Sequence, residues 1–222
     1  MLRLWQGSLI AALAVGGFVL GLIVWACFRF RARGDQLPRQ VRYNLPVEVL
    51  YTVIPVVIVA VLFYFTAIDE DTVDKLSAHP DLRVEVIGFQ WSWQFNYPAQ
   101  GLQITGRPGQ PPQLVLPVGE TIQFTEVSLD VIHSFWVVPF LFKRDVIPGP
   151  RHNQFEVTIT KAGVFAGHCA EYCGIGHDQM LFSVRAVSPA QFSSFVARAK
   201  AEATSGSPIY TLLPTSSSGS PS

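Results

Sequence analysis

The stretch Cys169-Ala-Glu-Tyr-Cys173-Gly-Ile-Gly-His177-Asp-Gln-Met180 decides how the second half of this chain must fold. It places two thiols, an imidazole and a thioether so close together in sequence that one loop can surround an ion. A second imidazole, His133, lies in Asp130-Val-Ile-His133-Ser-Phe-Trp136 and must arrive from a distant strand. Sulfur and imidazole donors in this combination favour copper. The pattern therefore predicts a metal site suited to electron transfer rather than to hydrolysis.

From residue 82 onward the sequence has the texture of a β domain. Short β-branched and aromatic runs alternate with Gly and Pro, which is typical of a sandwich or barrel. The runs that predict strands are Leu82–Ile87, Gln90–Tyr97, Gln113–Leu116, Thr121–Glu126, His133–Val138, Gln154–Ile159, Gly163–Ala166 and Leu181–Val187. We therefore expect an all-β domain over residues 81–188, with the metal-binding loop near its end.

Three segments beside the predicted strands carry other signals. Gly101–Pro112 is rich in turn residues and predicts a connector. Residues 189–204 start with Pro189 and continue Ala-rich, which predicts a short helix. Residues 205–222 are mostly Ser, Pro, Gly and Thr, a composition too polar to form a packed core. We expect a disordered tail there.

Two long uncharged runs, Leu4–Phe28 and Val49–Ile68, precede the β domain. A helix rises about 1.5 Å per residue, so each run is long enough to cross a hydrocarbon core of about 30 Å. We expect transmembrane helices over residues 1–28 and 47–68, a loop over 29–46 and a linker over 69–80. The predicted fold class is therefore a two-helix transmembrane hairpin, in contact with membrane lipid, plus an all-β domain.

The charges that flank the hairpin predict its orientation. The segment after the second run is acidic, Asp69-Glu-Asp-Thr-Val-Asp74. The connecting loop instead carries five arginines, Arg29, Arg31, Arg33, Arg39 and Arg42. Basic loops stay in the cytoplasm, so both termini and the β domain are expected on the extracytoplasmic side. A cleaved signal peptide is the alternative reading of the first run, but cleavage before Cys27 would leave the basic loop outside.

The overall charge excludes one class of partner. The 222 residues carry 16 basic and 16 acidic side chains, which gives a formal net charge of zero. No basic stripe in the sequence marks a surface that could follow a phosphate backbone. We expect no nucleic-acid partner.

Four interpretations of the two cysteines compete. A disulfide between Cys169 and Cys173 suits an oxidising compartment, but it needs neither His177 nor Met180. Zinc would accept two Cys and two His but has little use for a thioether. A blue-copper site needs one Cys, which leaves the other unused. Two thiolates that bridge two copper ions would use both, with one imidazole and one weaker donor for each ion.

Several motifs together resemble subunit II of the haem–copper cytochrome c oxidases. They are the Cys169–Met180 loop, the His133 segment, Gly88-Phe-Gln-Trp91-Ser-Trp93 and Lys143-Arg-Asp-Val-Ile-Pro-Gly149. In the hairpin, Leu45-Pro-Val-Glu48 and Thr52-Val-Ile-Pro55 are similar to that subunit's anchor. The resemblance runs from about residue 5 to 188, and Phe140-Leu-Phe-Lys-Arg-Asp145 resembles actinobacterial members.

The resemblance implies a cupredoxin-like Greek-key barrel that carries a binuclear copper A centre. On the matching positions, Cys169 and Cys173 bridge the two copper ions. His133 and Met180 then hold one ion, and His177 holds the other.

Three further roles follow from the resemblance. The backbone carbonyl of Glu171 completes the copper ligands, and its carboxylate binds magnesium at the boundary with subunit I; otherwise Glu171 is an ordinary solvated loop residue. Trp91 receives the electron from the donor, whereas Trp93 fills the core; aromatic residues of a strand otherwise pack. Glu48 lies at the cytoplasmic mouth of a proton channel of subunit I, or alternatively it caps its helix.

Acidic side chains at the outer face would attract a basic cytochrome through their long-range field. Asp130, Asp145 and Glu126 are the candidates by position. Each is equally well read as an ordinary solvated charge, and Asp130 is alternatively a brace for the metal loop.

The resemblance also implies a function and a location. The chain would accept electrons from a c-type cytochrome, free or within a bc1 complex, and pass them to haem in subunit I. Oxygen is reduced to water there and protons are translocated; subunit III is a further partner, in the plasma membrane of a bacterium.

Three rival classes remain. A quinol oxidase subunit would lack the copper ligands, a nitrous or nitric oxide reductase would share the loop, and a copper-delivery protein would not need the Trp91 motif.

Overall fold

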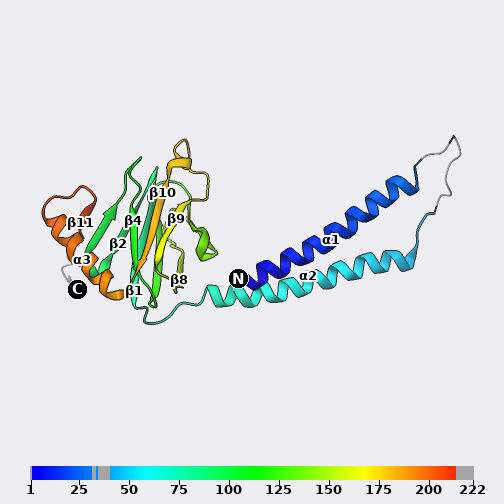
Figure 1. The fold of residues 1–222 in the computed structure, drawn as a ribbon, viewed down its shortest axis with the longest axis horizontal. Helices are drawn as coiled ribbons and strands as arrows, with labels where there is room; N and C mark the ends of the chain where they lie inside the picture. Colours follow the sequence, from blue (N-terminus) through cyan, green and yellow to red (C-terminus); the bar gives the residue numbers. More distant parts are fainter. Residues whose placement is uncertain (1, 32–33, 35–40, 214–222) are drawn as a thin grey trace. The chain divides into compact units, whose positions relative to one another are not determined.

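The computed structural model describes residues 2–31, 34 and 41–213. The chain divides into two compact units, residues 1–72 and residues 73–222 (Figure 1). Among the described residues, the first unit is helical and every strand lies in the second. This division agrees with the predicted hairpin and β domain.

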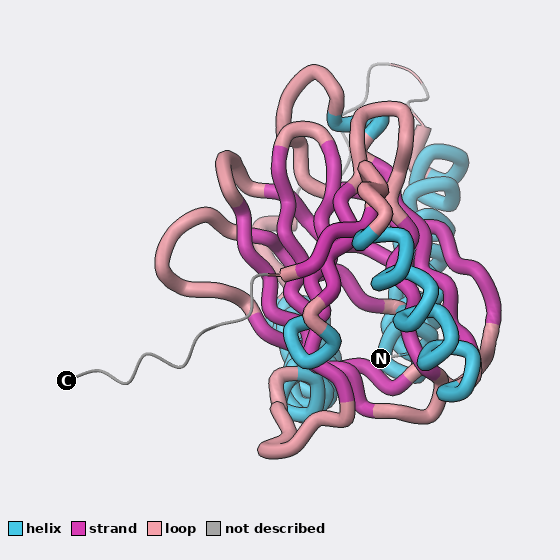
Figure 2. Tube along the Cα trace, turned by 90° about the vertical axis from the view of Figure 1, so that its left-hand side faces the viewer, coloured by secondary structure: helices cyan, strands magenta, loops and turns pink. Residues whose placement is uncertain are grey.

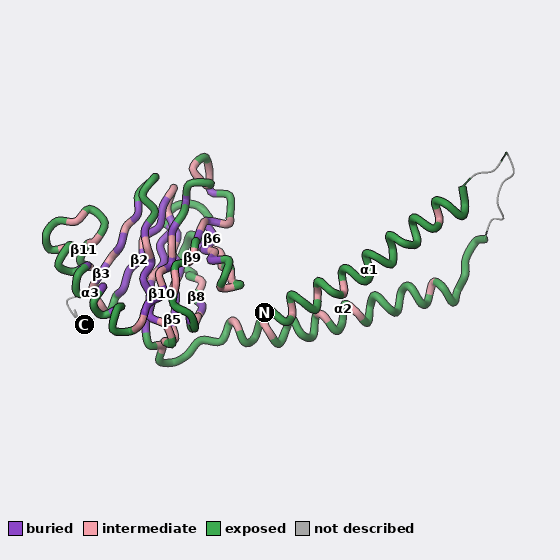
Figure 3. Tube along the Cα trace, in the orientation of Figure 1, coloured by how far each residue is buried: buried purple, intermediate pink, exposed green. Residues whose placement is uncertain are grey.

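The first unit consists of two long helices, α1 (Leu2–Arg29) and α2 (Leu45–Val73). Both are long and apolar enough to cross a membrane, and neither has a buried residue (Figure 3). Such an apolar surface is stable only when lipid or protein covers it. Helix α2 continues through the acidic segment, so the first residues of the predicted linker over 69–80 are helical. Most of the predicted loop over 29–46 lies outside the described residues.

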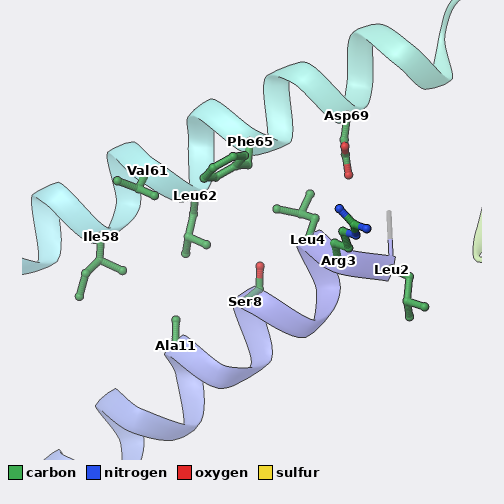
Figure 4. Close-up of a pocket in the computed structure, with 11 residues that line it drawn as sticks. Leu2, Arg3, Leu4, Ser8, Ala11, Ile58, Val61, Leu62, Phe65 and Asp69 are labelled. Carbon is green, nitrogen blue, oxygen red and sulfur yellow. The ribbon is translucent and has the colours of Figure 1, made fainter.

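A groove of about 810 Å³ lies between the two helices (Figure 4). Its walls are apolar, with Leu4 on α1 and Phe65 and Leu62 on α2 among them. At one end Arg3 and Asp69 point toward one another across the groove (Figure 4). The groove is thus mainly apolar, and its charged lining residues, Arg3 and Asp69, lie at one end (Figure 4).

The second unit is a sandwich of two sheets. The larger sheet has the strand order β11-β3-β2-β1-β5-β8, and the smaller has the order β4-β10-β9-β6-β7. Their strands are β1 (Leu82–Phe89), β2 (Ser92–Tyr97), β3 (Leu102–Thr105), β4 (Gln113–Pro117), β5 (Thr121–Ser128), β6 (His133–Val137), β7 (Phe142–Val146), β8 (Gln154–Thr158), β9 (Gly163–Cys169), β10 (Leu181–Val187) and β11 (Tyr210–Leu212). Short 3₁₀ helices are η1 (Pro98–Gln100), η2 (Val138–Phe140) and η3 (His177–Gln179). Helix α3 (Pro189–Thr204) lies beside the strands (Figure 2).

Aromatic side chains from both sheets fill the space between the layers. Phe135 of β6 stacks on Phe182 of β10 with ring centroids 4.7 Å apart, and Phe124 of β5 stacks on Phe155 at 4.8 Å. Trp93 is fully buried and meets Phe182 edge-on. Buried aromatic residues of this size contribute much of a domain's packing energy, and they fix how the two sheets sit on each other.

Helix α3 begins where the sequence predicts. The Ser188 hydroxyl accepts a hydrogen bond from the Gln191 amide, and the Gln191 side chain accepts one from the Ser188 amide. This capping box satisfies two backbone donors that would otherwise lack partners. The helix buries Phe192 and Phe195, and Phe192 packs against Tyr97 of β2.

The structure corrects the prediction of a wholly disordered tail over residues 205–222. Tyr210–Leu212 forms β11 and pairs with β3, and Tyr210 packs against Phe195. Strand β3 itself lies inside the predicted connector, and β7 was also missed. Residues 214–222 lie outside the described residues.

Candidate metal centre

The predicted metal donors come from two neighbouring strands and the loop that follows one of them. His133 is the first residue of β6, and Cys169 is the last residue of the adjacent β9. The register pairs Phe135 with Cys169, which holds the start of β6 beside the end of β9. The loop then passes through Cys173 and His177 and reaches Met180 just before β10. A strand pair and one loop thus converge on a single point.

The side-chain donor atoms of these residues face one another. The Sγ atoms of Cys169 and Cys173 lie 3.9 Å apart, and both thiols are free. His133 Nδ1 lies 4.0 Å from Cys169 Sγ, and His177 Nδ1 lies 3.6 Å from Cys173 Sγ. The donor atoms of His133, Cys169 and Cys173 all lie within 4.8 Å of one another, and all three residues are buried.

Two weaker donors complete the cluster. Met180 is fully buried, and its Sδ lies 3.7 Å from Cys173 Sγ. The backbone carbonyl oxygen of Glu171 lies 3.2 Å from Cys169 Sγ. Metal–sulfur and metal–nitrogen bonds of 2.0–2.3 Å in a tetrahedral site set neighbouring donors roughly 3.5 Å apart. The residues therefore fit a soft metal ion, because their donors already have the separations that ligands of such an ion require.

The two thiols do not ionise with equal ease. Burial raises the pKa of Cys169, but hydrogen bonds with His133 and with the backbone of Glu171 outweigh burial and lower it to about 7. Burial and the nearby Cys169 raise the pKa of Cys173 to about 12. Cys169 is therefore the thiol that loses its proton first. A second thiolate needs a bound cation, as in any metal site built from paired cysteines.

Asp130 holds the imidazole of His133 from behind. Its Oδ1 lies 2.8 Å from His133 Nε2, on the side of the ring away from the sulfur atoms. Burial raises the pKa of Asp130, but hydrogen bonds from the Gln90 and Val131 amides and from His133 outweigh burial and lower it. An ionised carboxylate here fixes the proton of His133 on Nε2 and leaves Nδ1 free to bind a metal.

The indole and amide side chains of the Gly88–Trp93 motif bind the metal loop directly. Gln90 Nε2 and Trp91 Nε1 both donate to the carbonyl oxygen of Cys173, at 2.7 and 3.1 Å. Trp93 Nε1 donates to the carbonyl of Met180 at 3.3 Å. Sequence reasoning missed Gln90, although it lies inside the quoted motif, because a glutamine carries no signal for a backbone contact.

Two glycines leave room for these contacts. A Cβ on Gly176 would lie 2.7 Å from two ring atoms of Trp91, and a Cβ on Gly88 would lie 3.0 Å from Cδ2 of His133. Any larger residue at Gly176 would push the indole off the loop. Trp91 therefore lies against the metal loop and is half-buried, whereas Trp93 is core, as predicted.

The structure corrects one of the predicted acidic surface residues. Glu126 is fully buried, because it faces inward on β5 with Ile122 and Phe124. It is therefore no part of an exposed acidic face. The Asp145 side chain is 45% exposed, accepts a hydrogen bond from Ser134 Oγ and pairs with Lys143 at 3.6 Å. That of Asp130 is 31% exposed and engaged with His133.

Two predicted residues remain, Glu171 in the metal loop and Glu48 in the helical unit. The Glu171 side chain is exposed while its carbonyl faces the sulfur atoms. Glu48 lies in the first turn of α2, and its Oε1 accepts a hydrogen bond from the Asn44 amide at 2.8 Å. This contact is the helix cap that the sequence allows as the alternative role of Glu48.

Comparison with known sequences agrees with this geometry. The family model for the cytochrome c oxidase subunit II periplasmic domain matches residues 110–187, and the model for the transmembrane domain of the same subunit matches residues 2–67. The chain belongs to the cytochrome c oxidase subunit II family. A probable cytochrome c oxidase subunit 2 of Streptomyces coelicolor is 47% identical, over 86% of this chain and 72% of that protein. The predicted family and its actinobacterial character are confirmed.

Two solved structures of this family share the β domain. The periplasmic domain of subunit II (CoxB) of Bradyrhizobium japonicum is 31% identical, with a TM-score of 0.53 over 57% of this chain and 99% of that one. A mixed disulfide intermediate between a thioredoxin-like protein and subunit II of cytochrome c oxidase is 32% identical, with a TM-score of 0.51 over 58% of this chain and 98% of that one. These likenesses confirm the cupredoxin-like fold of the β domain.

Proposed function

We propose that this member of the subunit II family binds two copper ions as a copper A centre and accepts electrons from a c-type cytochrome. The observation that carries the proposal is the convergence of two thiols, two imidazoles and a thioether, with the Glu171 carbonyl beside them. Cys169 and Cys173 would bridge the ions, with His133 and Met180 on one and His177 on the other. When bound, the copper pair supplies a one-electron redox couple.

The residues of the chain itself prepare the site for that couple. Asp130 orients His133, and Gln90 and Trp91 hold the Cys173 carbonyl. A loop fixed at so many points changes little when the charge of a bound ion changes, which favours rapid electron transfer. Trp91 would receive the electron, because its ring joins the surface to the loop. The partly exposed Asp130 and Asp145 would attract a basic cytochrome.

The wider assembly follows from the family. The electron would pass on to haem in subunit I, where oxygen is reduced to water and protons are translocated, with subunit III as a further partner. The exposed carboxylate of Glu171 would bind magnesium at the boundary with subunit I. Glu48 would lie at the mouth of a proton channel on the cytoplasmic side, with the β domain outside the plasma membrane of a bacterium.

The test uses the full chain in detergent, with its thiols reduced and copper added. An electron paramagnetic resonance signal from one electron shared by two copper nuclei supports the proposal. The pattern of a single copper nucleus, or no bound copper, contradicts it. Cys169→Ser should abolish the shared signal, and Met180→Leu should keep it while shifting the reduction potential. Cys27→Ser is the control, since Cys27 is exposed on α1 and should leave the signal unchanged.

We further propose that a thioredoxin-like protein reduces this chain before copper binds. The relative captured in a mixed disulfide with such a protein supports this step. An oxidised Cys169–Cys173 pair would exchange its disulfide with a partner dithiol, leaving two thiols here and a disulfide on the partner. When the chain has been oxidised in air, it should bind copper only after treatment with a thioredoxin-like dithiol protein. Copper binding without reduction would contradict the step.

A further inference from the structure

Glu126 is a buried acid that the proposed metal centre does not use. It is fully buried, and neither of its carboxylate oxygens has a hydrogen-bond partner among the described residues. Burying a carboxyl group without partners costs free energy, and most buried polar atoms in proteins avoid it. A group that persists in this setting invites a functional explanation.

The charged groups that face Glu126 come from β7. Arg144 and Asp145 both act on its carboxyl, whereas its paired residue on β1 is the apolar Val86. On the β8 side the backbone carbonyl of Asn153 accepts the Glu126 amide. Burial raises the pKa of Glu126 to about 9, because the favourable field of Arg144 is weaker than the cost of removing water.

Arg144 is placed to serve the ionised form of this acid. Its Nη2 donates to Asp74 Oδ1 at 2.6 Å, while its Nε is buried and has no hydrogen-bond partner among the described residues. The Arg144 guanidinium therefore binds the Asp74 carboxylate at the surface through Nη2, and its buried Nε is free to donate to another acceptor. A proton that leaves Glu126 would leave a carboxylate close to a positive charge that is already in place.

The strand register places Glu126 two residues along β5 from Ser128, whose partner on β1 adjoins the metal centre. Glu126 pairs with Val86, and two residues further Ser128 pairs with Gly88, which adjoins the His133 ring. One such inward step along a strand is roughly 7 Å. At an effective dielectric constant of about 20, a unit charge roughly 10 Å away changes proton affinity by about tenfold. An electron that arrives at the centre would therefore raise the proton affinity of the Glu126 carboxylate.

We propose that Glu126 is a redox-linked proton-binding site, whose carboxylate binds a proton from solvent more tightly when the metal centre has gained an electron and less tightly when the electron has left. The inference rests on the proposed copper function. In the pH range where Glu126 titrates, reduction would add one electron from the haem protein donor and a fraction of a proton per centre from solvent. An O–H bond of hydronium breaks, and the O–H bond of the Glu126 carboxylic acid forms. Oxidation breaks that bond and returns the proton to solvent.

The test measures the reduction potential of the copper-loaded full chain against pH, with a soluble organic mediator at an electrode. The wild-type potential should fall by about 59 mV in total as Glu126 titrates, which is the tenfold affinity change expressed for one electron. Glu126→Gln has no proton to release and should lack this fall. Glu85→Gln is the matched control, because Glu85 lies on the neighbouring strand and a glutamine can still accept from Asn96.

The outcomes separate this inference from the copper proposal. If the two-copper signal is present but wild type and Glu126→Gln show the same dependence on pH, the inference is wrong and the function stands. If no two-copper signal forms, both are wrong. A second readout needs no variant to fold: the reduced-minus-oxidised infrared spectrum of wild type should contain a carboxylic acid C=O band that shifts in heavy water. Absence of that band also overturns the inference.

Discussion

At the scale of single residues, Asp130 decides how firmly the imidazole of His133 is held. Asp130→Asn keeps the size of the side chain but removes its charge, so the proton on His133 Nε2 loses its ionic acceptor. Loss of such a partner typically lowers metal affinity 10–100-fold. We expect a loss of that size in a competition titration with a copper chelator. Glu202→Gln, on the exposed face of α3, is the control and should leave the copper affinity unchanged. If Asp130→Asn binds copper as tightly as wild type, His133 does not need the Asp130 carboxylate.

Glu126 makes a prediction about stability that needs no metal. Its pKa rises from an ordinary value of about 4.5 to about 9 on folding, so between these values the folded chain keeps a proton that the unfolded chain releases. Stability conferred by this group is therefore complete at low pH and falls as pH rises toward 9. Relative to Glu126→Gln, wild type should lose up to about 1.4 kcal/mol per pH unit between about pH 5 and pH 8.

Denaturant unfolding of the metal-free full chain in detergent, followed by tryptophan fluorescence at several pH values, measures this difference. Parallel curves for the two proteins would mean that Glu126 is ionised or hydrated in the folded state.

At the scale of elements, the metal loop depends on close contact between Gly176 and the Trp91 ring. Gly176→Ala would place a methyl group 2.7 Å from the indole, and overpacking of this kind typically costs 1–3 kcal/mol. We expect a loss of that size in the free energy of unfolding and weaker copper binding. The double variant Gly176→Ala with Trp91→Ala removes the clash, so it should cost less than the sum of the two single changes. Additive effects would contradict the packing argument.

The sequence predicted most of the elements and the candidate donors that the structure brings together, because both signals are local. The donor loop is a short run with fixed spacing, and its strands alternate strongly between apolar and polar residues. Strand β7 was missed because Lys143, Arg144 and Asp145 break that alternation at the edge of a sheet. Strand β11 was missed because three residues in a polar tail pair only once β3 is in place. The pairing of β11 with β3 joins segments more than 100 residues apart, so no local pattern announces it.

The position of Glu126 shows both the reach and the limit of such reasoning. Its inward direction could have been read from alternation, since Ile122, Phe124 and Glu126 share one face of the strand. Proximity to His133 in sequence suggested the outer surface instead. The sequence does not show which residues of the other sheet face Glu126. Arg144 and Asp145 of β7 come near this acid only because the two sheets pack together.

At the scale of the whole molecule, function depends on which side of the membrane the β domain occupies. The formal charge is zero, yet five arginines lie in or beside the loop between α1 and α2, and acidic residues cluster at the other end of α2. Because basic loops resist translocation, this asymmetry should keep the loop in the cytoplasm. Protease added to intact spheroplasts should therefore remove a tag placed at the C-terminus of the wild-type chain.

Replacing Arg29, Arg31, Arg33, Arg39 and Arg42 with glutamine should leave a large fraction of the tag protected, since the charge bias is then gone. Lysine at the same five positions is the matched control, because it keeps the charge and should preserve full access to the tag. A tag that stays fully accessible in the glutamine variant would mean that orientation is set elsewhere in the chain. A protected wild-type tag would place the metal loop in the cytoplasm, where no extracytoplasmic cytochrome could reach it.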